Sequence, residues 1–324
     1  MLRAGIIGCN GVSGLYDQNF FERKDKFSIT HASGYFLSES CNLVSVCDPN
    51  EDRLTKFRDF WKLQNVYSCH REMLLNEKLD IVSICVPTEN HYEVFCDAIN
   101  FGVKGIFCEK PLSLSQQEAN RMQELAKKNN VKVSVNYFRR WNKSINKLKS
   151  SIHEGEFGNF IKGIFKYTKT TTGNACHLMD LANWFFDEPT KISLDANSID
   201  IDRLDFEFLY ADSSGIKFIN IPNNDSYIFI DCELFFESMH VSISQRGQFI
   251  SISPIGSDKI YDNFKIIDNQ EPFEADWRNA PLRAINNLDQ CIKSDLPCES
   301  PIHDSIILIK QLDKLKKLYM EQVK

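Results

Sequence analysis

The chain has 324 residues, more than one hydrophobic core normally serves, and its 43% of hydrophobic residues can fill two domains. A formal net charge of −6 without any dense basic run argues against a nucleic-acid binder and against binding at an anionic membrane surface. The sequence has no run of 18 apolar residues and no export signal at its start, which predicts a cytoplasmic protein. Its 11 cysteines show no C-x-x-C spacing, so we expect reduced thiols and no metal site.

A short apolar strand over residues 2–7 leads into a turn, residues 8–14, that reads G-C-N-G-V-S-G. The turn is a degenerate G-x-G-x-x-G, with Asn10 at the second glycine and Ser13 at the third. Asparagine tolerates left-handed backbone and serine is small, so we expect the turn to approach the pyrophosphate of a dinucleotide. The turn residues expected to bind this cofactor are Gly8, Asn10, Gly11, Val12 and Ser13.

A second strand, residues 43–47, ends at Asp48, whose carboxylate can accept hydrogen bonds from both ribose hydroxyls of an adenosine. An acid at this position favours NAD over NADP. Gly8 and Asp48 are 40 residues apart, more than the usual roughly 20 to 30, so we expect an insertion around residues 17–32. The alternative interpretation is an α/β turn that binds no nucleotide.

The residues that follow alternate between strands and helices, which predicts a parallel, doubly wound sheet. The expected strands are 79–87, 103–108 and 131–137, and the expected helices are 88–100 and 115–128. Ser115 and Glu118 form a capping box at the start of the second helix.

Lys110 lies in the sequence C-E-K-P, directly after the strand that ends at Cys108. The carboxyl ends of strands in an open α/β sheet face the ligand, so a lysine at this point can contact one. An exposed loop lysine is the alternative.

The second half is richer in strands separated by Asn, Asp, Ser and Gly turns, which predicts an antiparallel sheet. Its expected strands are 161–168, 204–211, 227–236 and 239–244, and its expected helices are 281–294 and 304–320. The fold class is therefore α/β, with an N-terminal Rossmann domain and a C-terminal α+β domain on an open, mainly antiparallel sheet. We expect residues 1–136 to bind the dinucleotide. Residues 137–324 are expected to bind substrate and form the oligomer, with the last helix packing back on the body.

The order of these motifs resembles the Gfo/Idh/MocA oxidoreductases, the family of glucose-fructose oxidoreductase and inositol dehydrogenase, over nearly the whole chain. The resemblance is carried by the turn at 8–14, Asp48-Pro49 with Arg53, V-P-T-E-N-H at 86–91, E-K-P at 109–111 and N-A-C-H-L-M-D-L at 174–181. It implies that Lys110 and His177 are the catalytic pair and face each other across the nicotinamide. Further cofactor-binding residues implied by the resemblance are Arg53, Pro87, Thr88, Asn90, His91, Glu109 and Lys110.

The sequence departs from the family at Gly173, where many inositol and sugar dehydrogenases have an aspartate four residues before the histidine. The usual acid-base pair is therefore incomplete. A subgroup associated with bacterial surface-sugar pathways is more similar, because it has a Tyr-x-Lys-Gly run and asparagines before the histidine. Tyr167, Lys169 and Asn174 occupy those places here.

In a dehydrogenase, His177 is the better general acid or base, because an imidazole titrates near pH 6.5. Lys110 would donate a hydrogen bond to the reacting oxygen. For His177 the alternative is a helix-start residue satisfied by backbone, and His91 has the corresponding alternative of capping or packing its own helix.

Several other residues are candidates for binding substrate. Tyr167 and Lys169 would share one face of a strand, which is equally consistent with a solvated face. Arg139-Arg140-Trp141 suits a phosphate or carboxylate, although an interdomain salt bridge is the preferred interpretation. Asp180 would orient His177 or stabilise the helix start. The candidate substrate-binding residues are Tyr167, Lys169, Asn174, Arg140, Trp141 and Asp180.

These observations favour an NAD-dependent oxidoreductase acting on a secondary alcohol or ketone of a sugar, nucleotide sugar or cyclitol, with NADP the less favoured cofactor. The resemblance also implies a homo-oligomer, either a dimer or a tetramer. The alternatives are a reductase of an imine or tetrapyrrole-like substrate and a non-catalytic nucleotide-binding regulator or scaffold. Gly173 and Asn10 keep the non-catalytic alternative open.

Overall fold

The computed structural model describes residues 1–324 except 20–26, 197, 199, 223–225 and 262. The chain divides into two compact units. Unit 1 consists of Met1–Trp141 and Arg278–Ile309, and unit 2 consists of Asn142–Trp277 and Lys310–Lys324. The division expected near residue 136 did not anticipate that Arg278–Ile309 join the first unit.

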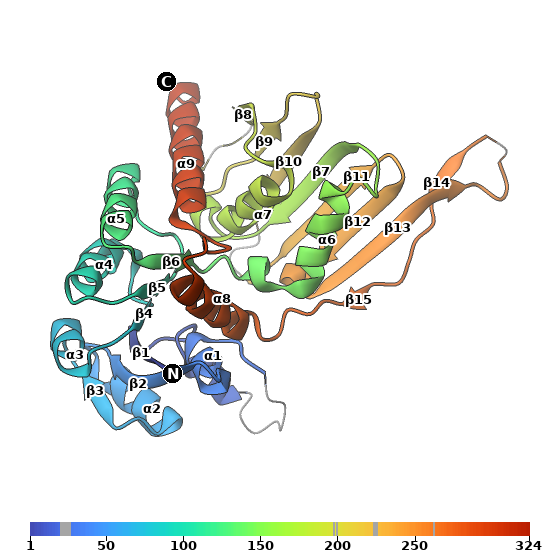
Figure 1. The fold of residues 1–324 in the computed structure, drawn as a ribbon. Helices are drawn as coiled ribbons and strands as arrows, with labels where there is room; N and C mark the ends of the chain where they lie inside the picture. Colours follow the sequence, from blue (N-terminus) through green and yellow to red (C-terminus); the bar gives the residue numbers. More distant parts are fainter. Residues whose placement is uncertain (20–26, 197, 199, 223–225, 262) are drawn as a thin grey trace. The chain divides into compact units, whose positions relative to one another are not determined.

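Unit 1 contains a six-stranded, all-parallel sheet in the order β3-β2-β1-β4-β5-β6, which confirms the predicted Rossmann sheet (Figure 1). The central strands are short apolar runs, since both faces of the sheet are covered. The strands are β1 (Leu2–Ile7), β2 (Cys41–Cys47), β3 (Asn65–Tyr67), β4 (Ile81–Ile84), β5 (Gly105–Cys108) and β6 (Lys132–Val135).

Helices cover both faces of this sheet, with α3, α4 and α5 on one face and α1, α2 and α8 on the other (Figure 1). Helix α8 joins unit 1 because its apolar side packs into the core there, with Leu288 fully buried. The predicted cap of α5 is confirmed, since the Ser115 hydroxyl accepts a hydrogen bond from the Glu118 amide. The helices are α1 (His31–Leu37), α2 (Glu51–Trp61), α3 (His70–Glu77), α4 (His91–Asn100), α5 (Gln116–Lys128) and α8 (Ala280–Ser294).

Unit 2 is built on a nine-stranded sheet, β14-β13-β12-β11-β7-β10-β9-β8, with β15 paired to β13. Its pairs are antiparallel except for β7 and β10, so the sheet is mixed, with one parallel pair that the sequence did not reveal. The strands are β7 (Phe160–Tyr167), β8 (Lys191–Leu194), β9 (Phe206–Leu209), β10 (Gly215–Asn220), β11 (Ile230–Phe236), β12 (Met239–Ser244), β13 (Phe249–Ser257), β14 (Lys265–Ile267) and β15 (Phe273–Glu274).

Helices α6 (Lys143–His153) and α7 (Cys176–Phe186) lie on the same side of this sheet (Figure 1). The strand face below them buries an aromatic core in which Phe206 and Phe218 stack with ring centroids 4.4 Å apart. Helix α9 (Ile302–Gln322) is tied to α7 by reciprocal side-chain hydrogen bonds between Asn183 and Gln311. Among the described residues, no helix is both long enough and apolar enough to cross a membrane.

Candidate active site

The glycine turn after β1 requires glycine at its first position. Gly8 has φ +100°, and a Cβ atom there would lie 2.5 Å from the carbonyl oxygen of Cys85. Its amide donates to the Cys47 carbonyl oxygen at 2.7 Å. Gly8 therefore holds the turn against the ends of β2 and β4 at a separation that no side chain permits.

Asn10 and Ser13, which stand in place of two glycines of the motif, stabilise the turn by hydrogen bonds to each other. The Asn10 amide donates to the Ser13 hydroxyl at 2.6 Å, and the Ser13 amide donates to the side-chain oxygen of Asn10 at 3.1 Å. This leaves the amides of Gly11 and Val12 without an acceptor among the described residues, on a turn where Val12 is exposed. Two adjacent backbone amides without an internal acceptor suit the pyrophosphate of a dinucleotide, so the turn fits the expected cofactor.

The expected insertion in the first crossover contains the start of a helix. After a short 3-10 helix, η1 (Leu15–Asn19), helix α1 begins at His31, and residues 20–26 of the expected insertion lie outside the described residues. Thr30 caps α1 and donates to the carboxylate of buried Asp17. Burial raises the pKa of Asp17 although hydrogen bonds from Thr30 and Ser33 oppose the shift. The amide of His31 donates to the Val12 carbonyl oxygen, so α1 also supports the glycine turn.

Asp48, at the end of β2, has a structural task that the sequence did not reveal. Its Oδ2 atom accepts from the Cys9 amide at 2.8 Å, and its Oδ1 atom accepts from the Asn50 amide at 2.8 Å and from Arg53 at 2.9 Å. The carboxylate is almost fully buried, whereas the Arg53 side chain is half exposed. Asp48 therefore holds the glycine turn onto β2. Its carboxylate, which we expected to meet the ribose, is paired with Arg53.

Glu109, at the end of β5, is the centre of a buried polar network. Its Oε1 atom lies 3.0 Å from Nε2 of His31 and accepts from the Asn136 side chain at 2.7 Å. Burial alone would raise the pKa of Glu109, but the hydrogen bonds from His31 and Asn136 and the charges of His31 and Lys110 hold it below its usual value. The network therefore keeps Glu109 ionised beside Lys110.

His31 carries this network across three strands of the sheet. Its Nδ1 atom lies 3.0 Å from the Ser83 hydroxyl on β4, which lies 2.9 Å from the hydroxyl of Tyr35. The ring therefore forms hydrogen bonds with Glu109 through Nε2 and with Ser83 through Nδ1. The ring also packs on Phe107, with centroids 4.3 Å apart. The sequence contained only one signal for this role, a histidine directly after the cap of α1.

Lys110 follows Glu109 at the carboxyl end of β5, as the sequence predicted, and is half-buried. Its amide donates to Oε2 of Glu109 at 3.3 Å, and the peptide bond to Pro111 is cis. The Glu109 network therefore fixes the backbone that carries the lysine.

The loop after β4 presents the other expected cofactor-binding residues differently. Pro87 and Asn90 are exposed and Thr88 is half-buried, so ligand can reach them. His91 is fully buried, with Nδ1 3.0 Å from the Pro111 carbonyl oxygen and Nε2 3.0 Å from the carbonyl oxygen of Val86. This packing favours the alternative for His91, in which the imidazole joins the loop to the segment after Lys110.

In unit 2, His177 lies in the first turn of α7 and is half-buried. A single π-helical turn, η4 (Thr171–Ala175), precedes it, and the Thr170 hydroxyl accepts from the Gly173 amide at 3.0 Å. A Cβ atom at Gly173 would lie 2.7 Å from that hydroxyl oxygen. The cap thus gives a physical reason for glycine at position 173. Asn174 donates to the Thr168 carbonyl oxygen at 2.9 Å and so anchors the same turn.

Two of the candidate substrate-binding residues are placed differently from the sequence prediction. Tyr167 is fully buried, and its hydroxyl donates to the Leu204 carbonyl oxygen and contacts Thr171. Strand β7 ends at Tyr167, and Lys169 has φ +63°, so the two do not share a strand face. Tyr167 is a core residue whose hydroxyl has one backbone and one side-chain partner inside unit 2.

The Arg139-Arg140-Trp141 run and Asp180 are also buried. Arg140 donates to the Glu299 carbonyl oxygen at 3.0 Å and pairs with Asp304, and all three residues belong to unit 1. This ion pair of Arg140 therefore lies inside unit 1.

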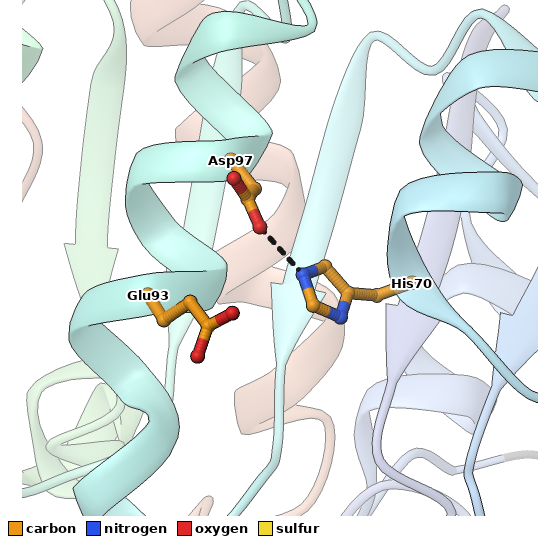
Figure 2. Close-up of side chains that lie close together, drawn as sticks. All are labelled: His70, Glu93 and Asp97. Carbon is orange, nitrogen blue, oxygen red and sulfur yellow. Dashed lines mark hydrogen bonds and ion pairs between the residues drawn. The ribbon is translucent and has the colours of Figure 1, made fainter.

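One cluster outside this region has the composition of a metal site. His70, Glu93 and Asp97 offer ligand atoms that all lie within 4.8 Å of one another between α3 and α4 (Figure 2). The guanidinium of Arg71 already pairs with both carboxylates, at 2.9 Å from Glu93 and 2.7 Å from Asp97. Burial opposes the shift, but hydrogen bonds from His70 and Arg71 lower the pKa of Asp97. The cluster thus joins two helices by ion pairs.

Comparisons with known proteins agree with the Rossmann sheet of unit 1. Residues 2–137 match the family model GFO_IDH_MocA, described as an oxidoreductase family with an NAD-binding Rossmann fold. This match supports NAD as the cofactor, as the sequence predicted. Oxidoreductase P35 of Formosa agariphila is 28% identical over 56% of this chain and 51% of its own length. The myo-inositol 2-dehydrogenase of Thermotoga maritima is 30% identical over 40% of this chain and 38% of its own length. The chain thus matches about half or less of the length of these relatives.

A solved structure shows the same fold over the whole chain. Levoglucosan dehydrogenase in complex with NADH has a TM-score of 0.79 at 13% identity, covering 99% of this chain and 97% of that one. At this identity the likeness establishes the fold alone.

Proposed function

From the match of residues 2–137 to the Gfo/Idh/MocA oxidoreductases, we propose that this chain is an NAD-dependent dehydrogenase of a sugar or cyclitol. It would transfer a hydride between NAD and a secondary alcohol or ketone. The observation that carries the proposal is the buried network of His31, Asn136 and Glu109, which fixes Lys110 at the carboxyl end of β5. That end of a doubly wound sheet is where ligands bind.

The described residues of unit 1 fit a dinucleotide. The open amides of Gly11 and Val12 would hold the pyrophosphate, and Asp48 with Arg53 would meet the ribose of the adenosine. When bound, NAD supplies the carbon that accepts or donates the hydride. The protein binds and orients both reactants and manages the proton of the hydroxyl.

Lys110 and His177 would share that proton management. His177 would take the hydroxyl proton on a ring nitrogen as the alcohol is oxidised, and return it when a ketone is reduced. The Nζ atom of Lys110 would donate a hydrogen bond to the same oxygen and stabilise its developing negative charge. Because Gly173 replaces the aspartate of many family members, no carboxylate stands four residues before His177 to orient it.

The names of similar proteins support the substrate class. The Thermotoga maritima relative is called a myo-inositol 2-dehydrogenase, and the structural neighbour is a levoglucosan dehydrogenase. For this chain we propose a sugar, nucleotide sugar or cyclitol, in the cytoplasmic metabolism of a bacterial surface polysaccharide. We further propose a homo-oligomer in which the face of the unit 2 sheet opposite α6 and α7 is covered by a second copy.

The test is formation of NADH, followed near 340 nm, with NAD and a panel of inositols, free sugars and nucleotide sugars. Lys110→Ala is run in parallel with Lys128→Ala, a matched change at an exposed lysine at the end of α5. We expect turnover that Lys110→Ala abolishes and Lys128→Ala leaves intact. Equal activity of both variants would contradict the proposed role of Lys110.

A second candidate function is a nucleotide-binding protein without turnover, and Gly173 is the observation that favours it. This candidate predicts that NADH binds and that no substrate of the panel, in either direction, is converted. It also predicts that Lys110→Ala leaves the function of the protein intact.

A further inference from the structure

Unit 2 contains a cavity of about 430 Å³, and none of the residues discussed above lines it. It is lined by the apolar segment 228–230 and by the polar side chains of Asp231, Gln245, Arg246 and Gln248. This volume lies within the range of small-molecule sites, roughly 300 to 1,000 Å³, and the mixture of an apolar wall with a few polar groups is typical of them.

Asp231 lines this cavity, and its carboxylate has one unsatisfied oxygen. Its Oδ1 atom is buried and has no hydrogen-bond partner among the described residues. Burial raises the pKa of Asp231, although backbone amides of Gln245 and Arg246 and the charge of Lys166 oppose the shift. A buried acceptor left without a donor is costly, so a ligand hydroxyl that donates to Oδ1 would be bound favourably.

Arg246 also lines the cavity and brings a positive charge to it. Arg246 is exposed, and no carboxylate of the described residues forms an ion pair with it. It lies in the short helix η5 (Gln245–Gly247), where Gln245 has φ +49° and Arg246 has φ +64°. Two consecutive non-glycine residues in left-handed backbone are strained, and such strain persists where the surrounding structure fixes it, often at binding sites. The guanidinium is a fork of donors suited to a carboxylate or phosphate.

The cavity wall is joined by hydrogen bonds to the segment that carries His177. Phe229 and Thr168 exchange hydrogen bonds, with the Thr168 amide donating at 3.0 Å and the Phe229 amide donating to the Thr168 hydroxyl at 2.9 Å. The Asn174 side chain then donates to the Thr168 carbonyl oxygen at 2.9 Å. Asn174 is three residues before His177. The cavity wall is therefore linked by hydrogen bonds, through Thr168 and Asn174, to the turn that carries the proposed catalytic base.

We propose that this cavity binds an acidic monosaccharide, with Arg246 on its carboxylate or phosphate and Asp231 on a neighbouring hydroxyl. The proposal rests on the proposed function and deepens it, because it names an anionic sugar as the substrate class. Gln245 and Gln248 supply amides that donate to and accept from the remaining hydroxyls.

The test is isothermal titration of the full chain, with and without NAD, using three probes: D-glucuronate, D-glucose 6-phosphate and D-glucose. We expect one of the two acids to bind at least about tenfold more tightly than glucose, since a charge-assisted hydrogen bond is worth that much. The acid that binds more tightly distinguishes carboxylate from phosphate. Binding of neither acid, or equal binding of acids and glucose, would overturn the proposal.

The variants are Arg246→Gln, which removes the charge, and Arg246→Lys, which keeps it without the fork. Arg246→Gln should abolish the preference for the acid, Arg246→Lys should retain part of it, and Asp231→Asn should weaken both acids and glucose. Lys265→Gln removes an exposed positive charge on β14 of the same unit and should change nothing. A preference that survives Arg246→Gln in a folded variant would refute the assignment.

These experiments distinguish a failure of the cavity assignment from a failure of the proposed dehydrogenase activity. Acid-selective binding without any formation of NADH would contradict the dehydrogenase and leave the cavity as assigned. Turnover of neutral sugars that is indifferent to Arg246→Gln would support the dehydrogenase and refute the acidic-sugar site.

Discussion

The Nε2 atom of His31 lies 3.0 Å from the Oε1 atom of Glu109, so the first helix of the chain reaches the end of β5. The two residues are 78 positions apart in sequence, and the His31 side chain is 1% exposed. Helix α1 therefore positions the residue directly before the proposed catalytic lysine.

Replacing His31 by leucine should destabilise unit 1. Leucine fills the space but leaves buried Glu109 without one of its donors, a loss of about 1 to 3 kcal/mol in the free energy of unfolding. Urea unfolding measures the change. His303→Leu, at an exposed histidine in the first turn of α9, is the matched control and should have little effect. Equal stability of the two variants would show that the network contributes nothing.

The lowered pKa of Glu109 predicts a pH dependence of stability. The folded-state pKa lies below 4.5, the ordinary pKa of a glutamate, so the unfolded chain binds the proton more readily. The stabilisation is therefore complete above pH 4.5 and is lost as the pH falls through the lower folded-state value. Urea unfolding of the wild type and Glu109→Gln between about pH 3 and about pH 7 should show a difference that shrinks on acidification. A difference that grows towards low pH would have the wrong sign.

Substitution of Gly8 by alanine should damage the cofactor turn more than an ordinary glycine substitution. The added Cβ would lie 2.5 Å from the Cys85 carbonyl oxygen, on backbone with φ +100°. Strain and overlap together should cost about 2 to 5 kcal/mol. Gly102→Ala is the matched control, since φ is +82° and nothing lies within 4 Å, which leaves about 1 to 2 kcal/mol of strain alone. Urea unfolding and fluorescence titration with NADH compare the two, and equal effects would argue against a close approach at Gly8.

Introducing aspartate at Gly173 should break the cap made by Thr170. The new Cβ would lie 2.7 Å from the Thr170 hydroxyl oxygen, so the hydrogen bond to the residue 173 amide is lost, at about 0.5 to 2 kcal/mol. In a Thr170→Ala background that bond is already absent, and Gly173→Asp should cost less. A double-mutant cycle by urea unfolding measures the coupling. Strictly additive effects would exclude the cap as the reason for glycine.

The sequence predicted the elements of the fold better than their partners. The apolar runs that became β4 and β5 were evident because parallel strands are covered on both faces. The parallel pairing of β7 with β10 was missed, since periodicity identifies a strand but not the strand beside it. Strand β10 itself was not predicted.

In the candidate site, too, the sequence revealed local motifs but not the contacts between distant residues. Lys110 and the Gly8 turn follow from motifs that are local in sequence. The role of His31 depends on a contact across 78 positions, and the internal use of Arg140 depends on Asp304, which lies in the returning C-terminal segment. Tyr167 was misplaced because its partner, the Leu204 carbonyl oxygen, lies in a loop that no pattern connects to β7.

The role of Lys110 is tested most directly by kcat/KM of the wild type and Lys110→Ala with NAD and the substrate found in the panel, alongside the Kd for NADH. We expect Lys110→Ala to lower kcat/KM by about 100-fold or more, while NADH binding and folding are unchanged. A variant that keeps the wild-type kcat/KM would contradict the assignment of Lys110 to the reacting oxygen.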